Sequence, residues 1–139
     1  DEYTIYTRLI EGKYFAYQKM FTEGEINTCA SRTALIGAMT RAKMCTEEKQ
    51  PAVFQIEDDV LNISIRDKLA DYQEQVPLQE TVCKSIRLGF DSRLVLETLK
   101  AFTCDNIALG FTSPRTPMIV EAEDSDMKAM VLPVAIREA

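Results

Sequence analysis

The sequence contains no histidine, and this absence excludes more chemistry than any other feature of its composition. Without imidazole, every Ser-His-Asp or Cys-His mechanism is excluded, together with every metal site that needs a histidine ligand. No apolar run approaches the roughly 20 residues that a membrane-spanning helix needs. We therefore expect no metal, no cofactor and no membrane partner.

Paired cysteines and a leader segment are also missing. The four cysteines are widely spaced without a CxxC pair, at Cys29, Cys45, Cys83 and Cys104. This spacing predicts reduced thiols, mostly in the core, rather than disulfides. The first residues include no initiator methionine, no basic segment and no apolar segment, so we expect a piece of a longer chain.

What is present suits one globular domain. The chain has 139 residues, of which 46% are apolar and 27% are charged. Its net charge of -6 argues against a surface that is basic all over. Any contact with nucleic acid must therefore come from a local patch.

The order of predicted elements occurs twice. The first half predicts a strand at 25–30, a helix from its N-cap Ser31 to Cys45, and strands at 52–57, 60–66 and 71–78. The second half predicts a strand at 85–90, a helix at 92–102 after its N-cap Asp91, and strands at 106–112, 117–123 and 128–134. A shift of 60 positions pairs Ser31 with Asp91, Leu35 with Val95, Met39 with Leu99 and Ala42 with Phe102. We therefore expect an α+β fold, a duplicated β-α-β-β-β unit with two helices packed on antiparallel sheet.

The two predicted helices are the basic part of an acidic protein. They carry five bases, Arg32, Arg41, Lys43, Arg93 and Lys100, and one acid, Glu97. The rest of the chain has 11 bases and 21 acids. Such a basic helical face can contact a phosphate backbone without reading bases. From charge alone, an ordinary solvated helix face is the better interpretation.

Four motifs, in order, resemble the C-terminal domain of the bacterial DNA polymerase III β subunit, the sliding clamp. They are TRLIEGKYFAYQKMF at 7–21, ALIGAMTRAKMC at 34–45, IRLGFDSRLVLETLKAF at 86–102 and MVLPVAI at 130–136. The chain departs from the family pattern at Phe15, where proline is usual, and at Leu94, where an aromatic is usual. Each motif alone is weakly specific, but their order and spacing on a duplicated unit make the resemblance strong.

The resemblance implies a DNA clamp (processivity) fold. Residues 1–24 would form the crossover from a preceding clamp domain, and 25–139 the C-terminal clamp domain, with repeats at about 25–80 and 84–136. The family's function would be that of a noncatalytic processivity factor in the cytoplasm, associated with the nucleoid during replication. The implied partners are duplex DNA, encircled without sequence preference, linear peptide motifs of DNA polymerases and the clamp loader, and a second clamp chain in a head-to-tail homodimer.

The resemblance also implies three sets of site residues. The peptide-binding pocket would comprise Lys19, Met20, Leu94, Pro114, Thr116, Met130, Val131, Leu132, Pro133 and Val134. The face toward DNA would comprise Arg32, Arg41, Lys43, Arg93 and Lys100, although Arg41 could equally pair with an acid at the helix edge. The subunit interface would comprise Met44, Cys45, Asp71 and Glu74, and Met44 already lies outside the apolar stripe of its helix.

Two other functions remain open from the residues themselves. A small enzyme would need a carboxylate or thiol mechanism around Asp58, Asp59, Glu121 or Glu123, but acids in hairpin turns are typical of solvated turns. We therefore expect no catalytic residues. A stand-alone clamp-like module could bind polymerase peptides without forming a ring. Without the resemblance, the apolar residues at 130–134 are best interpreted as core, with Pro133 protecting a sheet edge.

Overall fold

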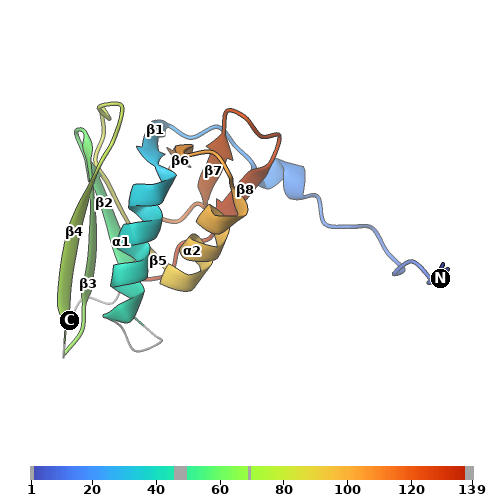
Figure 1. Cartoon of the computed structure of the whole chain (residues 1–139). Coiled ribbons are helices and arrows are strands. Elements are labelled where there is room, and N and C mark those ends of the chain that lie inside the picture. Colours follow the sequence, from blue (N-terminus) through green and yellow to red (C-terminus); the bar gives the residue numbers. More distant parts are fainter. Residues whose placement is uncertain (1, 46–49, 69, 137–139) are drawn as a thin grey trace.

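Two β-α-β-β-β repeats make up the body of the molecule (Figure 1). The computed structural model describes residues 2–45, 50–68 and 70–136. The first repeat comprises β1 (Ile26–Ser31), α1 (Arg32–Met44), β2 (Ala52–Glu57), β3 (Val60–Arg66) and β4 (Asp71–Pro77). The second comprises β5 (Ile86–Phe90), α2 (Ser92–Ala101), β6 (Asn106–Phe111), β7 (Met118–Ala122) and β8 (Lys128–Val131). The predicted order of elements and the predicted α+β clamp fold are confirmed.

The two repeats exchange their first strands. One antiparallel sheet has the order β1-β6-β7-β8, and the other has the order β4-β3-β2-β5. Thus β1 joins three strands of the second repeat, while β5 joins three strands of the first. Phe54 on β2 and Phe90 on β5 are both buried, with ring centroids 5.1 Å apart, so one aromatic pair connects the repeats.

The helices lie next to each other and cover the sheets, with α1 against β3 and β4 and α2 against β8. The Ser31 hydroxyl accepts from Ala34 N, and the Asp91 carboxylate accepts from Arg93 N, which confirms both predicted N-caps. Leu35, Met39, Val95 and Leu99 are almost completely buried. The apolar side chains that recur at helical spacing in α1 and in α2 therefore face the core, because a period of 3.6 residues places them on one side of each helix.

The first repeat's hairpin turn also forms as predicted. Asp58 and Asp59 connect β2 to β3, and Glu57 pairs with Val60 across the turn. Asp58 has a φ of 50°, a left-handed conformation that aspartate tolerates better than most residues.

Two details differ from the sequence prediction. The last strand ends at Val131 instead of 134, because Pro133 has no N–H to continue the ladder. The cysteines are free thiols, but none of the four is buried: Cys29, Cys45 and Cys104 are half-buried, and Cys83 is exposed. Burial and the nearby Glu80 raise the pKa of Cys29, which keeps this thiol protonated at neutral pH.

The chain preceding the first repeat extends away from the body (Figure 1). It contains a short 3-10 helix, η1 (Tyr17–Met20), and residues 2–16 form no helix or strand. Large apolar side chains in this segment are exposed, namely Tyr3, Ile5, Tyr6, Leu9, Ile10, Tyr14, Phe15 and Tyr17. Over the described ranges, no helix is long and apolar enough to cross a membrane.

Candidate functional site

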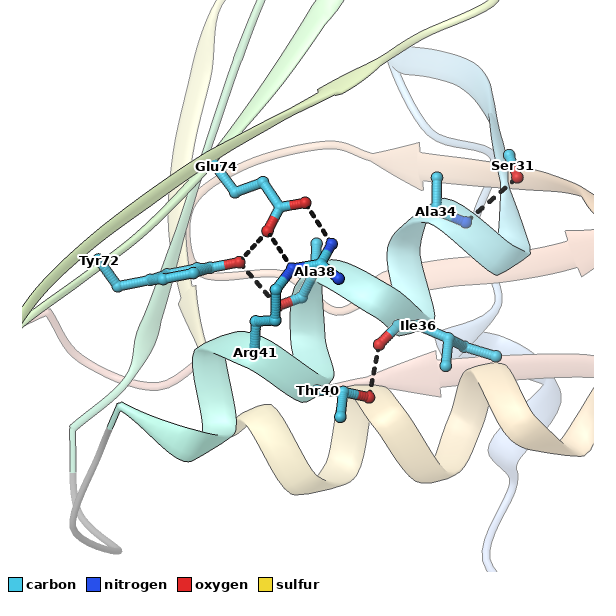
Figure 2. A network of polar contacts seen from close by, with 8 residues as sticks. All are labelled: Ser31, Ala34, Ile36, Ala38, Thr40, Arg41, Tyr72 and Glu74. Atoms are coloured by element: carbon cyan, nitrogen blue, oxygen red, sulfur yellow. Dashed lines mark hydrogen bonds and ion pairs between the residues drawn. The ribbon is translucent and has the colours of Figure 1, made fainter.

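Arg41 on α1 is bonded to the edge strand β4 (Figure 2). Its guanidinium donates to both carboxylate oxygens of Glu74, with an Nε–Oε2 distance of 2.9 Å and an Nη2–Oε1 distance of 2.5 Å. The Tyr72 hydroxyl contacts the same carboxylate and lies 3.0 Å from the backbone oxygen of Ala38. Tyr72 and Glu74 are two positions apart in β4, so both point toward α1. The network therefore fastens the strand to the helix.

The network favours the ionised form of its carboxylate. Hydrogen bonds from Arg41 and Tyr72 hold the pKa of Glu74 below its usual range. Burial, together with the bond to Glu74, raises the pKa of Tyr72 to about 12. The same pairing raises the pKa of Arg41. At neutral pH the site therefore holds a carboxylate, a guanidinium and a neutral phenol.

Arg32 connects the two helices. Its Nε donates to Cys104 O at 3.1 Å, and its Nη1 lies 3.4 Å from Leu99 O, near the end of α2. Leu99 lies in the last turn of α2, where a cation is favourable, and Cys104 follows the end of that helix. Arg32 therefore holds α1 against the second repeat.

Asp105 provides a second cap for α1 from the other repeat. Its carboxylate accepts from Ser31 Oγ at 2.8 Å, from Thr33 N at 2.8 Å and from Thr33 Oγ1 at 2.6 Å. Hydrogen bonds from Thr33, followed by the bond from Ser31, lower the pKa of Asp105. The N-terminus of α1 is thus satisfied by residues from both repeats.

The remaining helix bases lie in different surroundings. Arg93 Nη2 lies 3.5 Å from the carboxylate of Asp91, the cap of α2. Burial opposes ionisation of Asp91, but hydrogen bonds from the Arg93 backbone and side chain outweigh it and lower the pKa of Asp91. Lys43 and Lys100 are exposed in the last turns of α1 and α2. Arg32, Arg41 and Arg93 thus bond to named oxygens of the domain, and the side chains of Lys43 and Lys100 are exposed on the surface.

The four predicted interface residues do not share one surface. Met44 is 81% exposed at the end of α1, and Cys45 caps that helix through its backbone N–H. Asp71 and Glu74 are three positions apart in β4, so their side chains point to opposite faces of the sheet. Asp71 is exposed and lies 3.9 Å from Arg66, whereas Glu74 faces α1.

Large apolar side chains are exposed on α2 and in the segment that follows β8. The exposed fractions are 50% for Leu94, 59% for Leu132 and 40% for Val134. Since α2 packs against β8, these residues come from neighbouring elements. Met130 and Pro133 are half-buried beside them in the chain. Val131 is different, because it is only 3% exposed and belongs to the core. It supports this surface from within and exposes almost no area of its own.

The other predicted pocket residues lie in two separate segments. Thr116 closes the turn after β6 by donating from Oγ1 to Ser113 O at 3.1 Å. Pro114, in the same turn, lines a hollow of about 410 Å³ with residues of β1 and β5, and this hollow does not include residues 130–134. Lys19 and Met20 end η1, with Lys19 exposed and Met20 half-buried.

The four candidate catalytic acids are dispersed. Asp58 and Asp59 form a hairpin turn, Glu121 pairs with Lys128 at 2.6 Å, and Glu123 is exposed after β7. Among the residues that the structure describes, no three His, Cys, Asp or Glu side chains gather as metal ligands.

Sequence reasoning missed three residues that organise these surfaces, namely Tyr72, Gly89 and Asp105. Gly89 lies inside β5 and bonds to Val134, and a glycine inside a strand is a recognised signal of close backbone approach. No local signal marks Tyr72 or Asp105, because the bonds by which they hold α1 reach residues more than 30 positions away.

Comparison with known proteins identifies the class of protein that carries this fold. The family model described as "DNA polymerase III beta subunit, C-terminal domain" matches residues 20–135. The chain therefore belongs to the family of DNA polymerase III beta subunits, of which it contains the C-terminal domain.

The individual relatives are sliding clamps. The beta sliding clamp of Staphylococcus aureus is 25% identical over 133 residues, which cover 92% of this chain and 35% of the relative. That of Halalkalibacterium halodurans is 25% identical over 126 residues, 87% of this chain and 33% of the relative. A DNA polymerase sliding clamp from Pseudomonas aeruginosa, solved with a ligand, has the same fold, with a TM-score of 0.85, 20% identity, and coverage of 94% of this chain and 36% of its own. The chain thus spans about a third of the length of these proteins.

Proposed function

We propose that this chain is the C-terminal domain of a bacterial sliding clamp, a noncatalytic processivity factor that works in the cytoplasm, at the nucleoid during replication. The complete protein would encircle duplex DNA as a head-to-tail homodimer and tether DNA polymerases and the clamp loader. The family match over residues 20–135 is the observation that carries this proposal.

The surface on α2 and the C-terminal segment would bind the linear peptide motifs of these partners. Leu94, Leu132 and Val134 expose apolar area on neighbouring elements, and such area favours a partner. Leucine and the half-buried Met130 can adapt to different apolar anchors, which suits a protein with several partners. Lys19, Met20, Pro114, Thr116 and Pro133 would form its margin.

The helices would face the DNA. Lys100 would make weak, salt-sensitive contacts with phosphates, which allow a ring to slide, and the exposed Lys43 would add to the positive charge of the same face. Arg32, Arg41 and Arg93 already bond within the domain. They would therefore contribute to the positive electrostatic potential of the helical face more than to direct contacts with phosphates. No base readout is needed for this role.

The end of α1 and strand β4 would meet the second chain of the ring. Met44 provides exposed apolar area beside Cys45, and β4 is the open edge of its sheet. Residues 1–24 would cross over from a preceding domain, which would cover their exposed aromatic and aliphatic side chains.

The test is a titration of isotope-labelled chain with a peptide of the Gln-x-x-Leu-x-Phe type, followed by amide shifts in NMR spectra. The expected shifts cluster at Leu94, Thr116 and residues 130–134, with fast exchange because a preceding domain would complete the site. A peptide with alanine in place of its leucine and phenylalanine is the control. Saturating peptide that shifts nothing, both in this chain and in a chain extended by the preceding domain, would refute the peptide-binding role.

The stand-alone module remains the alternative. It shares the peptide surface but forms no ring, so the two candidates differ in what precedes Asp1 in the gene. Two further domains of similar length support the clamp, whereas an initiator methionine immediately before Asp1 supports the stand-alone module.

A further inference from the structure

The end of the described chain crosses from one sheet to the other. After β8 ends at Val131, residues 132–136, here named the C-terminal segment, reach the edge of β5. Val134 forms an isolated antiparallel bridge with Gly89, in which Val134 N donates to Gly89 O at 2.8 Å. The residue that anchors the C-terminal segment therefore also exposes apolar area on the proposed peptide surface.

Position 89 has no room for a side chain. A Cβ there would lie 2.8 Å from Val134 O, 3.0 Å from Ile136 Cγ1 and 3.3 Å from Pro51 Cβ. The first neighbour is a backbone atom, so the contact could be relieved only by moving the C-terminal segment. Gly89 does not have a positive φ, so the backbone conformation alone would accept other residues. Close approach of the C-terminal segment is what requires glycine at this position.

A second glycine in the same local sequence provides the contrast. Gly110 on β6 also lies between leucine and phenylalanine, in Leu109-Gly110-Phe111, as Gly89 does in Leu88-Gly89-Phe90. A Cβ at Gly110 would meet Asn27 Oδ1 at 3.2 Å, and its other neighbours would be 3.7 Å or more away. An asparagine side chain can turn aside, so alanine fits position 110 at much lower cost.

We propose that Gly89 is a positioning residue for peptide binding: it seats the C-terminal segment on β5 and so holds Leu132 and Val134 in place for a peptide. This inference rests on the proposed function. Pro133 has no N–H to donate, so the bond from Val134 N to Gly89 O is the backbone bond that ties the C-terminal segment to β5. If the bond is lost, a peptide must order the C-terminal segment as it binds, and this entropy cost lowers affinity.

The experiment compares Gly89→Ala with Gly110→Ala in the whole chain. We expect both variants to unfold cooperatively and Gly89→Ala alone to accelerate amide exchange at Val134. Titration with the Gln-x-x-Leu-x-Phe peptide should give Gly89→Ala a roughly tenfold weaker Kd, as expected when about one further residue must be ordered on binding. Gly110→Ala should bind the peptide like the wild type.

A second pair of variants keeps the inference testable if Gly89→Ala does not fold. Val134→Ala retains the N–H and shortens the side chain, whereas Val134→Pro also removes the N–H. Weaker peptide binding by the proline variant than by the alanine variant supports the positioning role, and equal binding contradicts it. Equal peptide affinity of the wild type and a folded Gly89→Ala overturns this inference alone. A wild-type chain that does not bind the peptide, either by itself or extended by the preceding domain, overturns the proposed peptide site and the inference together.

Discussion

Arg41 and Glu74, 33 residues apart in the sequence, form a doubly hydrogen-bonded ion pair that joins α1 to the edge strand β4. The resemblance assigned the base to a DNA-facing surface and the acid to a subunit interface. In the structure each neutralises the other, and the Arg41 side chain remains half-exposed. The ion pair therefore connects the proposed DNA-facing surface on α1 with the proposed subunit interface on β4. As long as the pair is intact, it holds β4 against the helix.

Replacing Glu74 with glutamine should change how stability depends on pH. The pKa of Glu74 is lower in the folded chain than its ordinary value of 4.5, so the folded state gains stability above pH 4.5 and loses it as pH falls through the folded-state pKa. Glu74→Gln lacks this contribution at all pH values. We expect the variant to be less stable than the wild type at pH 7 and the difference to shrink below about pH 4.5.

Urea denaturation at pH 7, 5 and 3.5 measures this difference. The other carboxylates with lowered pKa values, Asp91 and Asp105, are present in both proteins, so their contributions cancel. A stability difference that stays constant from pH 7 to 3.5 would show that the ionised pair contributes nothing.

Two hydroxyls on α1 allow a matched test of its capping. Ser31 Oγ accepts from Ala34 N, whereas Thr40 Oγ1 donates back to Ile36 O within the helix (Figure 2). Ser31 Oγ also donates to Asp105. Ser31→Ala should lower the free energy of unfolding by about 1–2 kcal/mol. Thr40→Ala should change it little, because a hydroxyl bonded to the carbonyl four residues earlier contributes little to helix stability. Chemical denaturation of both variants checks this, and equal losses would contradict the capping role of Ser31.

The fold was predictable because its signals are local. Caps at Ser31 and Asp91, apolar periodicity after each, and turn residues such as Asp58 each depend on a few neighbouring residues. Because the order of elements occurs twice, the prediction for each half of the chain also supported the prediction for the other half. Strand lengths were predicted less well at Pro133, where the ladder ends because a donor is missing and the chain changes sheet.

The surfaces were less predictable because they depend on contacts between the repeats. Whether Arg41 is available to a phosphate depends on Glu74, and whether Arg32 is available depends on carbonyls near the end of α2. Val131 and Leu132 are adjacent in the sequence, yet one is buried and the other exposed. Only the packing of β8 against its neighbours distinguishes them.

The helical face should bind DNA weakly, with Lys100 among its contacts. With a short duplex at low salt, we expect amide shifts at Lys100 and smaller shifts at Arg41, whose guanidinium is bonded to Glu74. The shifts should disappear at about 0.2 M salt, because a site with few phosphate contacts is readily screened.

Lys100→Gln and Lys84→Gln form the matched pair for this test, since both replace an exposed lysine. Lys84 pairs with Glu25 at 3.2 Å and lies before β5, outside both helices. NMR titration should show weaker DNA shifts for Lys100→Gln alone. If both substitutions weaken the DNA shifts equally, the DNA is attracted by the overall charge of the domain and not by the helical face. A stable complex with DNA at physiological salt would contradict weak binding by this domain.

Val131 and Leu132 should separate stability from peptide binding. Val131 is 3% exposed, so Val131→Ala removes buried methyl groups and should cost about 1–3 kcal/mol of unfolding free energy. Leu132 is 59% exposed, so Leu132→Ala should change stability by no more than about 0.5 kcal/mol. In the NMR titration, Leu132→Ala should weaken the peptide Kd at least about fivefold, while folded Val131→Ala should retain most of its affinity. If Leu132→Ala binds the peptide like the wild type, the exposed leucine is not an anchor and the peptide surface must lie elsewhere on the domain.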